Sequence, residues 1–393
     1  MNIGLNCFNI NPKYGGGINT YTFGLLNGFG RRGRNHNFKL FVKSTNKHLF
    51  ENYKKFTNFE IIELPEVSKF NYYIRAVALL SGESLYKIIT DKLYKYVIDE
   101  IESRADIVYT PTTILFPLGF KIPTLISMHD IQQIHYPEFF SKTELLNRKV
   151  HYDLSAKYAT YIQAATNFIK YDLINYYNLK DEQVPVIPSG VDIELFSKKD
   201  DNSYLKEKYN IPDDFIFFPA QLWYHKNHIT VLKALNILMK EYNLDIPLVM
   251  TGAKESAADE IFKFISDNNL SSVHYLGLVP FSDIKVLHQK AKFFITAALY
   301  EASSLPMLEA SASGTPLIAS ETPPNKEMGE ILKINFYPPK NFEYLAKLIF
   351  NIWNNNELIK EQLKYNNEHI YYYSWDNAAE RYLDFIEKHI NVK

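Results

Sequence analysis

The feature that most constrains this chain is a regular alternation of short apolar runs with helix-length amphipathic stretches. Each run is rich in β-branched or aromatic residues and is followed by turn residues and a helical interval. Strands that alternate with helices form parallel sheets covered by helices, so the pattern predicts an α/β fold. Candidate strands of a first series lie at 3–8, 38–42, 60–64, 107–109, 124–127, 161–164 and 184–187. A second series lies at 215–218, 248–250, 273–275, 293–296, 317–319 and 334–336.

The length of the chain and one break in this pattern predict two domains. With 393 residues, the chain is too long for one ordinary hydrophobic core. At 186–192 a candidate strand runs into the turn-forming sequence Val-Ile-Pro-Ser-Gly-Val-Asp. We therefore expect two doubly wound, Rossmann-like domains, 1–187 and 188–393. The second is expected to begin with a short helix at 204–209 and to include a terminal helix at 374–390.

Composition excludes some classes of protein and leaves one question open. A formal net charge of −1 argues against a dedicated nucleic-acid binder. Residues 31–55 nevertheless carry eight Lys and Arg side chains against one Glu. This segment is either an ordinary solvated surface or a patch for anionic lipid or a polyanionic acceptor.

Three further features bear on where the protein works. A single cysteine, Cys7, excludes an internal disulfide framework and fits a reducing compartment. The N-terminus has no basic segment followed by an apolar one, and the sequence contains no run of about 18 apolar residues. We therefore expect a cytoplasmic protein, with peripheral contact to the inner membrane face as an option.

The segment 298–320 carries the clearest signs of chemistry. A strand ends just before it, and Pro306 favours the first turn of a following helix, which Ser304 is placed to cap and Gly314 to stop. Such a helix directs its N-terminus beyond a strand's carboxyl end, where parallel sheets bind ligands and amides attract phosphate. Glu301 precedes this helix and Glu309 lies inside it, so both carboxylates can flank one ligand and accept hydroxyl hydrogen bonds. A capped core helix with two solvated acids explains the same residues equally well.

This segment resembles the E-x7-E signature of GT-B glycosyltransferases of family 4, which reads E-G-F-G-L-P-x-x-E-A-x-A-x-G-T-P-V-I-A-S. The resemblance implies that Glu301 faces the donor sugar and Glu309 holds the nucleotide ribose. It also implies that backbone amides near Ser304 and Leu305 hold the diphosphate. The chain departs from the signature at 302–304, where Ala-Ser-Ser replaces Gly-Phe-Gly in the wall of the sugar pocket.

A second segment, 217–228, follows the first strand of the second domain. Its residues 219–228 read Pro-Ala-Gln-Leu-Trp-Tyr-His-Lys-Asn-His, similar to the family motif G-R-L-x-x-x-K-N. Lys226 matches the lysine that neutralises the donor diphosphate, while Gln221 replaces the usual arginine. Branches of the family that use GDP-mannose or dTDP-rhamnose carry a P-A-Q-x-W-x-H-K-N-H form, which favours those donors. Two alternatives remain for this segment. Lys226 is an ordinary solvated side chain, or His225 and His228 form a metal site.

Three weaker matches complete the resemblance. The glycine-rich loop at 14–18, including Gly16 and Gly17, is similar to a family loop that approaches phosphate or acceptor, although a plain flexible turn fits equally well. His129, in the His-Asp pair after the strand at 124–127, matches a family histidine that approaches the donor sugar; a buried structural histidine is the alternative. The backbone of Leu278 and Val279 matches the stretch that reads the base.

The resemblance implies a retaining glycosyltransferase that acts on a nucleotide-sugar donor and a glycan or lipid-linked glycan acceptor, in cell-surface polysaccharide synthesis. The sequence contains no Asp-x-Asp metal motif, so we expect no metal and no cofactor. Three rivals remain: a catalytically silent partner subunit, another GT-B enzyme such as a nucleotide-sugar 2-epimerase, and a non-enzymatic sugar-binding module.

Overall fold

A computed structural model describes residues 1–10, 16–65, 74, 78–79, 82–201 and 203–390. The chain forms two compact units, Met1–Gly190 with Trp375–Lys393 (unit 1) and Val191–Ser374 (unit 2). The first boundary therefore follows Gly190, where the sequence predicts one after residue 187. Each unit is built around a six-stranded parallel sheet, as the strand–helix alternation predicts.

The sheet of unit 1 has the strand order β3-β2-β1-β4-β5-β6, and the order reverses between β1 and β4. Its strands are β1 (Asn2–Asn6), β2 (Asn37–Lys43), β3 (Phe59–Leu64), β4 (Ile107–Thr110), β5 (Thr124–Ser127) and β6 (Tyr161–Gln163). The seventh strand predicted at 184–187 is wrong, because Val186 forms only an isolated bridge with Ala164. Strands β4 and β5 are buried throughout, which explains why they read as unbroken apolar runs.

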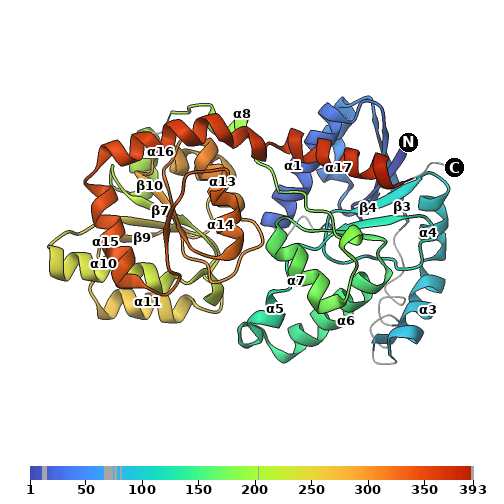
Figure 1. The fold of residues 1–393 in the computed structure, drawn as a ribbon, viewed down its shortest axis with the longest axis horizontal. Helices are drawn as coiled ribbons and strands as arrows, with labels where there is room; N and C mark the ends of the chain where they lie inside the picture. Colours follow the sequence, from blue (N-terminus) through green and yellow to red (C-terminus); the bar gives the residue numbers. More distant parts are fainter. Residues whose placement is uncertain (11–15, 66–73, 75–77, 80–81, 202, 391–393) are drawn as a thin grey trace. The chain divides into compact units, whose positions relative to one another are not determined.

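The helices of unit 1 come from both ends of the chain. They are α1 (Gly17–Arg32), α3 (Glu83–Leu93), α4 (Lys95–Glu102), α5 (Gln132–His135), α6 (Lys142–Tyr158), α7 (Asn167–Tyr177) and α17 (Trp375–His389). Helix α17 lies beside α1, so assigning the terminal helix to the second domain was wrong (Figure 1). The physical reason is a close helix contact: a Cβ on Gly24 would lie 2.1 Å from the Trp375 ring, and one on Gly28 2.4 Å from the Trp375 carbonyl oxygen.

A buried cluster of hydroxyl groups also holds α17 in unit 1. The Tyr382 hydroxyl lies 2.5 Å from that of Tyr21, 3.0 Å from Ser127 Oγ and 3.2 Å from the Tyr109 hydroxyl. Tyr21 and Tyr109 in turn contact Ser127 Oγ, at 3.0 Å and 2.8 Å. Each hydroxyl has partners, so this polar cluster is compatible with a buried position.

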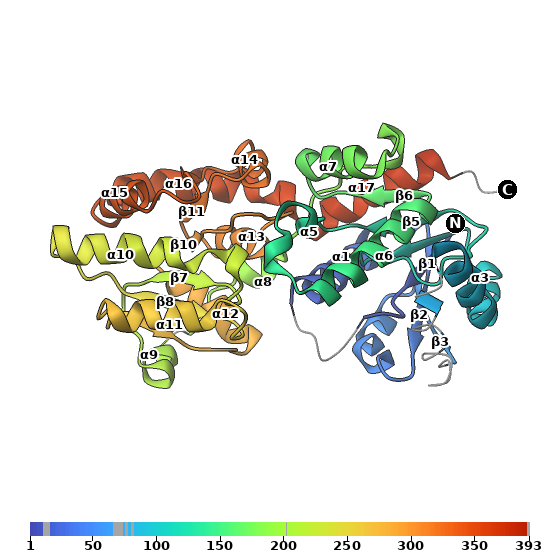
Figure 2. The same cartoon turned by 90° about the horizontal axis from the view of Figure 1, so that it is seen from below.

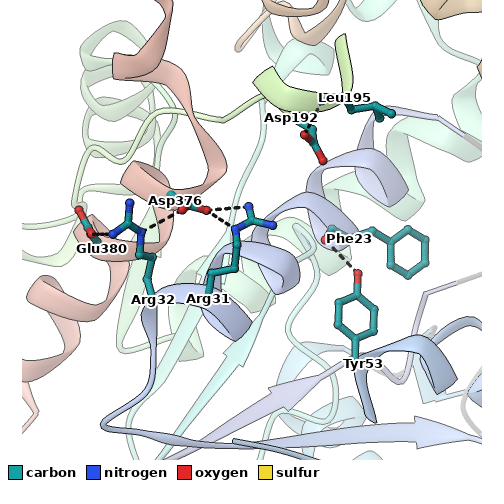
Figure 3. A network of polar contacts seen from close by, with 8 residues as sticks. All are labelled: Phe23, Arg31, Arg32, Tyr53, Asp192, Leu195, Asp376 and Glu380. Atoms are coloured by element: carbon teal, nitrogen blue, oxygen red, sulfur yellow. Dashed lines mark hydrogen bonds and ion pairs between the residues drawn. The ribbon is translucent and has the colours of Figure 1, made fainter. Parts of the chain in front are cut away.

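Five of the eight basic residues in the stretch 31–55 form ion pairs with described residues of unit 1. Figure 3 shows those of Arg31 and Arg32. Arg31 and Arg32 form ion pairs with Asp376 of α17, at 2.6 Å and 2.9 Å. Further pairs join Lys39 to Glu60, Lys47 to Glu63 and Lys54 to Glu51. Most of the neutralising acids lie outside the segment, so counting charges within it overstated its excess positive charge.

The sheet of unit 2 has the order β12-β11-β10-β7-β8-β9, and its order reverses between β7 and β10 (Figure 2). Its strands are β7 (Ile216–Pro219), β8 (Leu248–Thr251), β9 (Val273–Tyr275), β10 (Phe293–Thr296), β11 (Leu317–Ser320) and β12 (Asn335–Tyr337). All six strands of the second predicted series are confirmed. Each is a short apolar run in a sheet that helices cover on both faces.

The helices of unit 2 form two groups around the sheet. Helices α10 (His228–Tyr242), α11 (Ala258–Asp267) and α15 (Phe342–Trp353) share one apolar core with the sheet. The others are α8 (Ile193–Ser197), α9 (Ser203–Tyr209), α12 (Phe281–Lys290), α13 (Leu305–Ala312), α14 (Pro323–Gly329) and α16 (Asn356–His369). None of the helices in the described residues is both long and apolar enough to cross a membrane.

Candidate active site

The candidate site of unit 2 lies at the carboxyl ends of β7 and β10, where the strand order reverses. Helices that follow these two strands leave the sheet on opposite sides, and ligands of open α/β sheets bind in the crevice that results. The segment after β7 carries Gln221 and Lys226, and the segment after β10 carries Glu301 and Ser304. Lys226 and Glu301 are 75 residues apart in the sequence, and the fold brings them to the ends of neighbouring strands.

An ion pair joins these two segments. Lys226 Nζ lies 2.5 Å from Glu301 Oε1, and both side chains are partly buried, with 23% and 13% of their surfaces exposed. A second link between the segments is backbone, since the Leu299 N–H donates to the His225 carbonyl at 2.8 Å. The resemblance assigned Lys226 to a diphosphate and Glu301 to a sugar, and their direct contact was not predicted.

Asn227 fixes the turn that presents Lys226. Its backbone is left-handed, with φ of 55°, a conformation that asparagine tolerates better than most residues. Its side-chain amide donates to the carbonyl oxygens of Ala297, at 3.1 Å, and Pro339, at 2.8 Å. Asn227 therefore ties the end of β7 to the end of β10, a role that its position after Lys226 could have suggested.

Gln221, which replaces an arginine of the family motif, is held by a neighbour in sequence. Its Oε1 accepts a hydrogen bond from the Trp223 indole N–H at 2.7 Å. The end of β8 approaches the same turn, since a Cβ on Gly252 would lie 2.5 Å from the Ala220 carbonyl oxygen. The Gln221 side chain is thus part of a tightly packed turn and carries no charge toward a ligand.

Helix α13 begins and ends where the sequence predicts, but the side chain at its N-cap makes no capping hydrogen bond. Ser304 occupies the N-cap position and is buried, yet its side chain makes no capping hydrogen bond, so the predicted cap was wrong. Leu305 is the first helical residue and precedes Pro306. Gly314, with φ of 74°, ends the helix, and the Thr315 N–H donates to the Ala310 carbonyl at 2.9 Å.

Glu309 lies one turn inside α13 and is only 9% exposed. No described residue donates a hydrogen bond to its carboxylate. His288 of α12 lies close to it, with Nε2 3.8 Å from Glu309 Oε2. A carboxylate this buried retains its capacity to accept hydrogen bonds from a ligand hydroxyl.

The loop after β9 adds backbone groups to the same edge of the sheet. Leu278 is 77% exposed, while Val279 packs against the cluster around α12. Gly277, with φ of 68°, accepts a hydrogen bond from the Gly252 N–H at 2.8 Å, which ties this loop to the end of β8. The loop is therefore anchored at its base and exposed at Leu278.

His228, an alternative metal ligand in the sequence, packs in the core. Its ring stacks on Phe218 with centroids 4.3 Å apart. Burial lowers the pKa of His228 to about 3, and the positive charge of Lys226 acts in the same direction. Among the described residues, no group of three or more His, Cys, Asp or Glu side chains is arranged to hold a metal ion.

The remaining predicted residues lie in unit 1. Gly16 is the N-cap of α1, with φ of 142°, a conformation that favours glycine, and Gly17 is its first residue. Residues 14 and 15 of the glycine loop lie outside the described residues. The structure therefore places Gly16, Gly17 and His129 in a different unit from Lys226 and Glu301.

His129 follows β5, and its imidazole packs edge-on against Tyr21 with centroids 4.8 Å apart. Burial lowers the pKa of His129, which outweighs the opposite effects of the Asp130 charge and of the Pro111 carbonyl that the ring hydrogen-bonds. Its buried Nε2 has no hydrogen-bond partner among the described residues. Burial therefore favours the neutral form of the ring, and its Nε2 is unpaired among the described residues.

Comparison with known proteins connects this geometry to a family. The family model described as "Glycosyl transferases group 1" matches residues 201–369, and that described as "Glycosyltransferase Family 4" matches residues 15–195. The structure resembles that of Anabaena Alr3699/HepE, solved in complex with UDP and glucose, with a TM-score of 0.72 and 18% identity over 99% of this chain and 100% of that one. This chain is a GT-B glycosyltransferase of family 4.

Relatives of this glycosyltransferase include two O-antigen chain mannosyltransferases. The chain is 26% identical over 262 residues to the O-antigen chain mannosyltransferase RfbU of Salmonella typhimurium, covering 65% of this chain and 67% of that protein. It is 22% identical over 199 residues to the O-antigen chain mannosyltransferase B of Escherichia coli, covering 49% and 52%. The matched stretch thus spans about half of the second relative's length. The lipopolysaccharide glycosyltransferase WaaG shares the fold, with a TM-score of 0.68 and 15% identity over 98% of this chain and 99% of that one.

Proposed function

We propose that this glycosyltransferase moves a sugar from a nucleotide-diphosphate sugar to a glycan or lipid-linked glycan acceptor, with retention at the anomeric carbon, in the synthesis of a cell-surface polysaccharide. The observation that carries the proposal is the contact of Lys226 with Glu301 at the strand-order reversal of unit 2. This contact brings together a cation that suits a diphosphate and a carboxylate that suits sugar hydroxyls. A nucleotide sugar contains both a diphosphate and a sugar, so one ligand can engage both side chains.

The ion pair also defines what donor binding must change. Without a donor, Lys226 and Glu301 neutralise each other. A diphosphate offers Lys226 stronger negative charge, and sugar hydroxyls offer Glu301 hydrogen-bond donors. Binding therefore replaces an internal pair with two contacts to one ligand, which couples recognition of the phosphate to recognition of the sugar.

Sugar transfer leaves negative charge on the departing nucleoside diphosphate. The Lys226 ammonium and backbone amides at the start of α13, near Ser304 and Leu305, would stabilise that charge. Glu309 would accept the ribose hydroxyls, and the exposed backbone at Leu278 and Val279 would contact the base. His129, whose Nε2 has no hydrogen-bond partner among the described residues, would approach the sugar from unit 1, where Gly16 and Gly17 would contact phosphate or acceptor.

The donor that we favour is of the GDP-mannose or dTDP-rhamnose type. The segment 219–228 supports this choice, because Gln221 takes the place of an arginine, as in branches that use those donors. The two O-antigen mannosyltransferases among the relatives support it as well. The Anabaena protein was solved with UDP and glucose, so uridine nucleotides belong in the same test.

We also propose that transfer requires no metal ion or other cofactor, since the sequence has no Asp-x-Asp motif and Lys226 can carry the leaving-group charge. Activity should therefore persist in EDTA. Inactivation by chelator that magnesium or manganese reverses would contradict this part of the proposal.

The experiment that tests the proposal is a thermal-shift panel of GDP-, UDP-, dTDP- and ADP-sugars, followed by product analysis. A ligand at 100 times its Kd stabilises the folded protein by about 2.7 kcal/mol. We expect one base to dominate, and we expect its sugar to be transferred to an acceptor. No stabilisation by any donor would contradict the proposal. Release of an epimerised sugar would favour the 2-epimerase alternative, and donor binding without turnover would favour a silent partner subunit.

A further inference from the structure

A histidine occupies a position in unit 2 where an apolar side chain would pack better. His288 of α12 is fully buried among aromatic rings. The Phe217 ring lies edge-on to it at 4.9 Å, with Phe294 at 5.7 Å and Phe196 at 6.3 Å between centroids. Neither ring nitrogen has a hydrogen-bond partner among the described residues. Unpaired polar atoms in an apolar environment destabilise a fold, so packing alone does not explain this residue.

The carboxylate of Glu309 faces this histidine. The distance of 3.8 Å from Nε2 to Oε2 is within ion-pair range and slightly beyond a hydrogen bond. Two helices meet here, because α12 carries His288 and α13 carries Glu309. The Thr315 hydroxyl donates to the His288 carbonyl at 2.5 Å, which fastens the segment after α13 to the same turn of α12.

We propose that His288 is a positioning residue for Glu309. Its Nε2 faces one carboxylate oxygen at 3.8 Å from the buried side, which leaves the other oxygen to accept from a ligand hydroxyl. The inference rests on the proposed function, in which Glu309 accepts the ribose hydroxyls of the donor. It accounts for both unusual features, a buried carboxylate without hydrogen bonds and a histidine without partners inside an aromatic cluster.

Two substitutions of His288 separate positioning from packing in the full-length protein. His288→Phe fills the aromatic cluster and removes the polar contact, whereas His288→Gln keeps an N–H donor that can reach Glu309. We expect His288→Phe to keep or raise the Tm and to weaken binding of a free nucleoside diphosphate about 5- to 30-fold in calorimetry. GDP, UDP, dTDP and ADP are titrated in turn. His288→Gln should recover part of the affinity, and kcat at saturating donor should change little, as is expected for a lost ground-state contact.

Phe294→Leu is the matched control, because it disturbs the packing around the same histidine and leaves the polar contact. We expect it to lower the Tm without changing the nucleotide Kd. If His288→Phe binds as tightly as the unmodified protein, the inference is overturned. Equal losses in His288→Phe and Phe294→Leu would overturn it too, because packing would then explain both. If His288→Phe does not fold, His288→Met takes its place as the apolar variant, and its nucleotide Kd is compared with that of His288→Gln.

A double substitution distinguishes failure of this inference from failure of the proposed function. In a Glu309→Ala background, His288→Phe should have no further effect on the Kd, because the group it positions is absent. Full additivity of the two losses would overturn the inference while leaving Glu309 as a ligand-binding residue. An unchanged Kd in Glu309→Ala alone would instead refute the ribose assignment on which the inference rests.

Discussion

The two units share one strand topology but use the polar groups near their strand ends in different ways. In unit 1, the hydroxyls of Tyr21, Tyr109, Ser127 and Tyr382 are bonded to one another inside the core. In unit 2, Lys226 and Glu301 form a partly exposed ion pair, and Glu309 receives no hydrogen bond from any described residue.

The comparison separates polar groups that hold the fold from polar groups kept for a ligand. A satisfied cluster contributes stability and has little to offer a substrate. Charged groups that pair only with each other, or that receive no hydrogen bond in the free protein, gain partners when a ligand binds. In unit 1, Nε2 of His129 departs from this pattern, since it has no hydrogen-bond partner among the described residues.

Among the residues of this comparison other than the Lys226–Glu301 pair, the largest effect is expected for His129→Ala. If His129 contacts the sugar in the transition state, its loss should lower kcat about 100- to 1,000-fold, the range seen for single electrostatic contacts in active sites. The nucleoside diphosphate Kd should change little, because we assign nucleotide binding to unit 2. The control is Tyr21→Phe, which keeps the ring against His129 and removes a hydroxyl from the cluster. If the His129→Ala protein is destabilised but turns over normally, His129 stabilises the fold and does not contact the sugar in the transition state.

A smaller loss is expected for Glu309→Ala. Removing a charged acceptor of ribose hydroxyls should weaken nucleoside diphosphate binding by about 1.5–3 kcal/mol. Calorimetry measures the change, and Glu343→Ala, at the exposed first turn of α15, is a control for loss of one negative charge. Equal affinities in the two variants would place Glu309 outside the nucleotide site.

The smallest effect is expected for Tyr382→Phe. This change removes one hydroxyl from the cluster of unit 1 and should destabilise the protein by about 1–2 kcal/mol, with the kcat of the folded protein unchanged. Thermal unfolding and initial rates check both parts, and Tyr344→Phe at an exposed position serves as the control. A large loss of kcat at full stability would show that the cluster acts on the reaction as well.

The sequence predicted most of the fold because the buried strands of parallel sheets are unbroken apolar runs. The segment 184–187 has the same composition, but only Val186 finds a partner, and composition does not reveal pairing. The terminal helix was assigned to the wrong unit because its packing depends on small residues far away in sequence, such as Gly24 and Gly28.

The candidate site was predicted in part. The motifs located Lys226, Glu301 and Glu309 on segments that the structure places at strand ends or in the helix that follows. They could not indicate that Lys226 and Glu301 neutralise each other or that His288 faces Glu309, because these contacts depend on which helices and strands become neighbours.

The central claim is that donor binding breaks the ion pair between Lys226 and Glu301. Lys226 then contacts the diphosphate of the nucleotide sugar, and Glu301 contacts its sugar. Titrating the nucleoside diphosphate into Lys226→Met and Glu301→Gln by calorimetry tests it most directly. We predict that Lys226→Met weakens binding about 10-fold or more, because the diphosphate loses a charged contact. Glu301→Gln should bind the diphosphate as tightly as the unmodified protein or more tightly, since Lys226 is released from its partner, while sugar transfer is lost. Equal weakening in both variants, or none in either, would contradict the account.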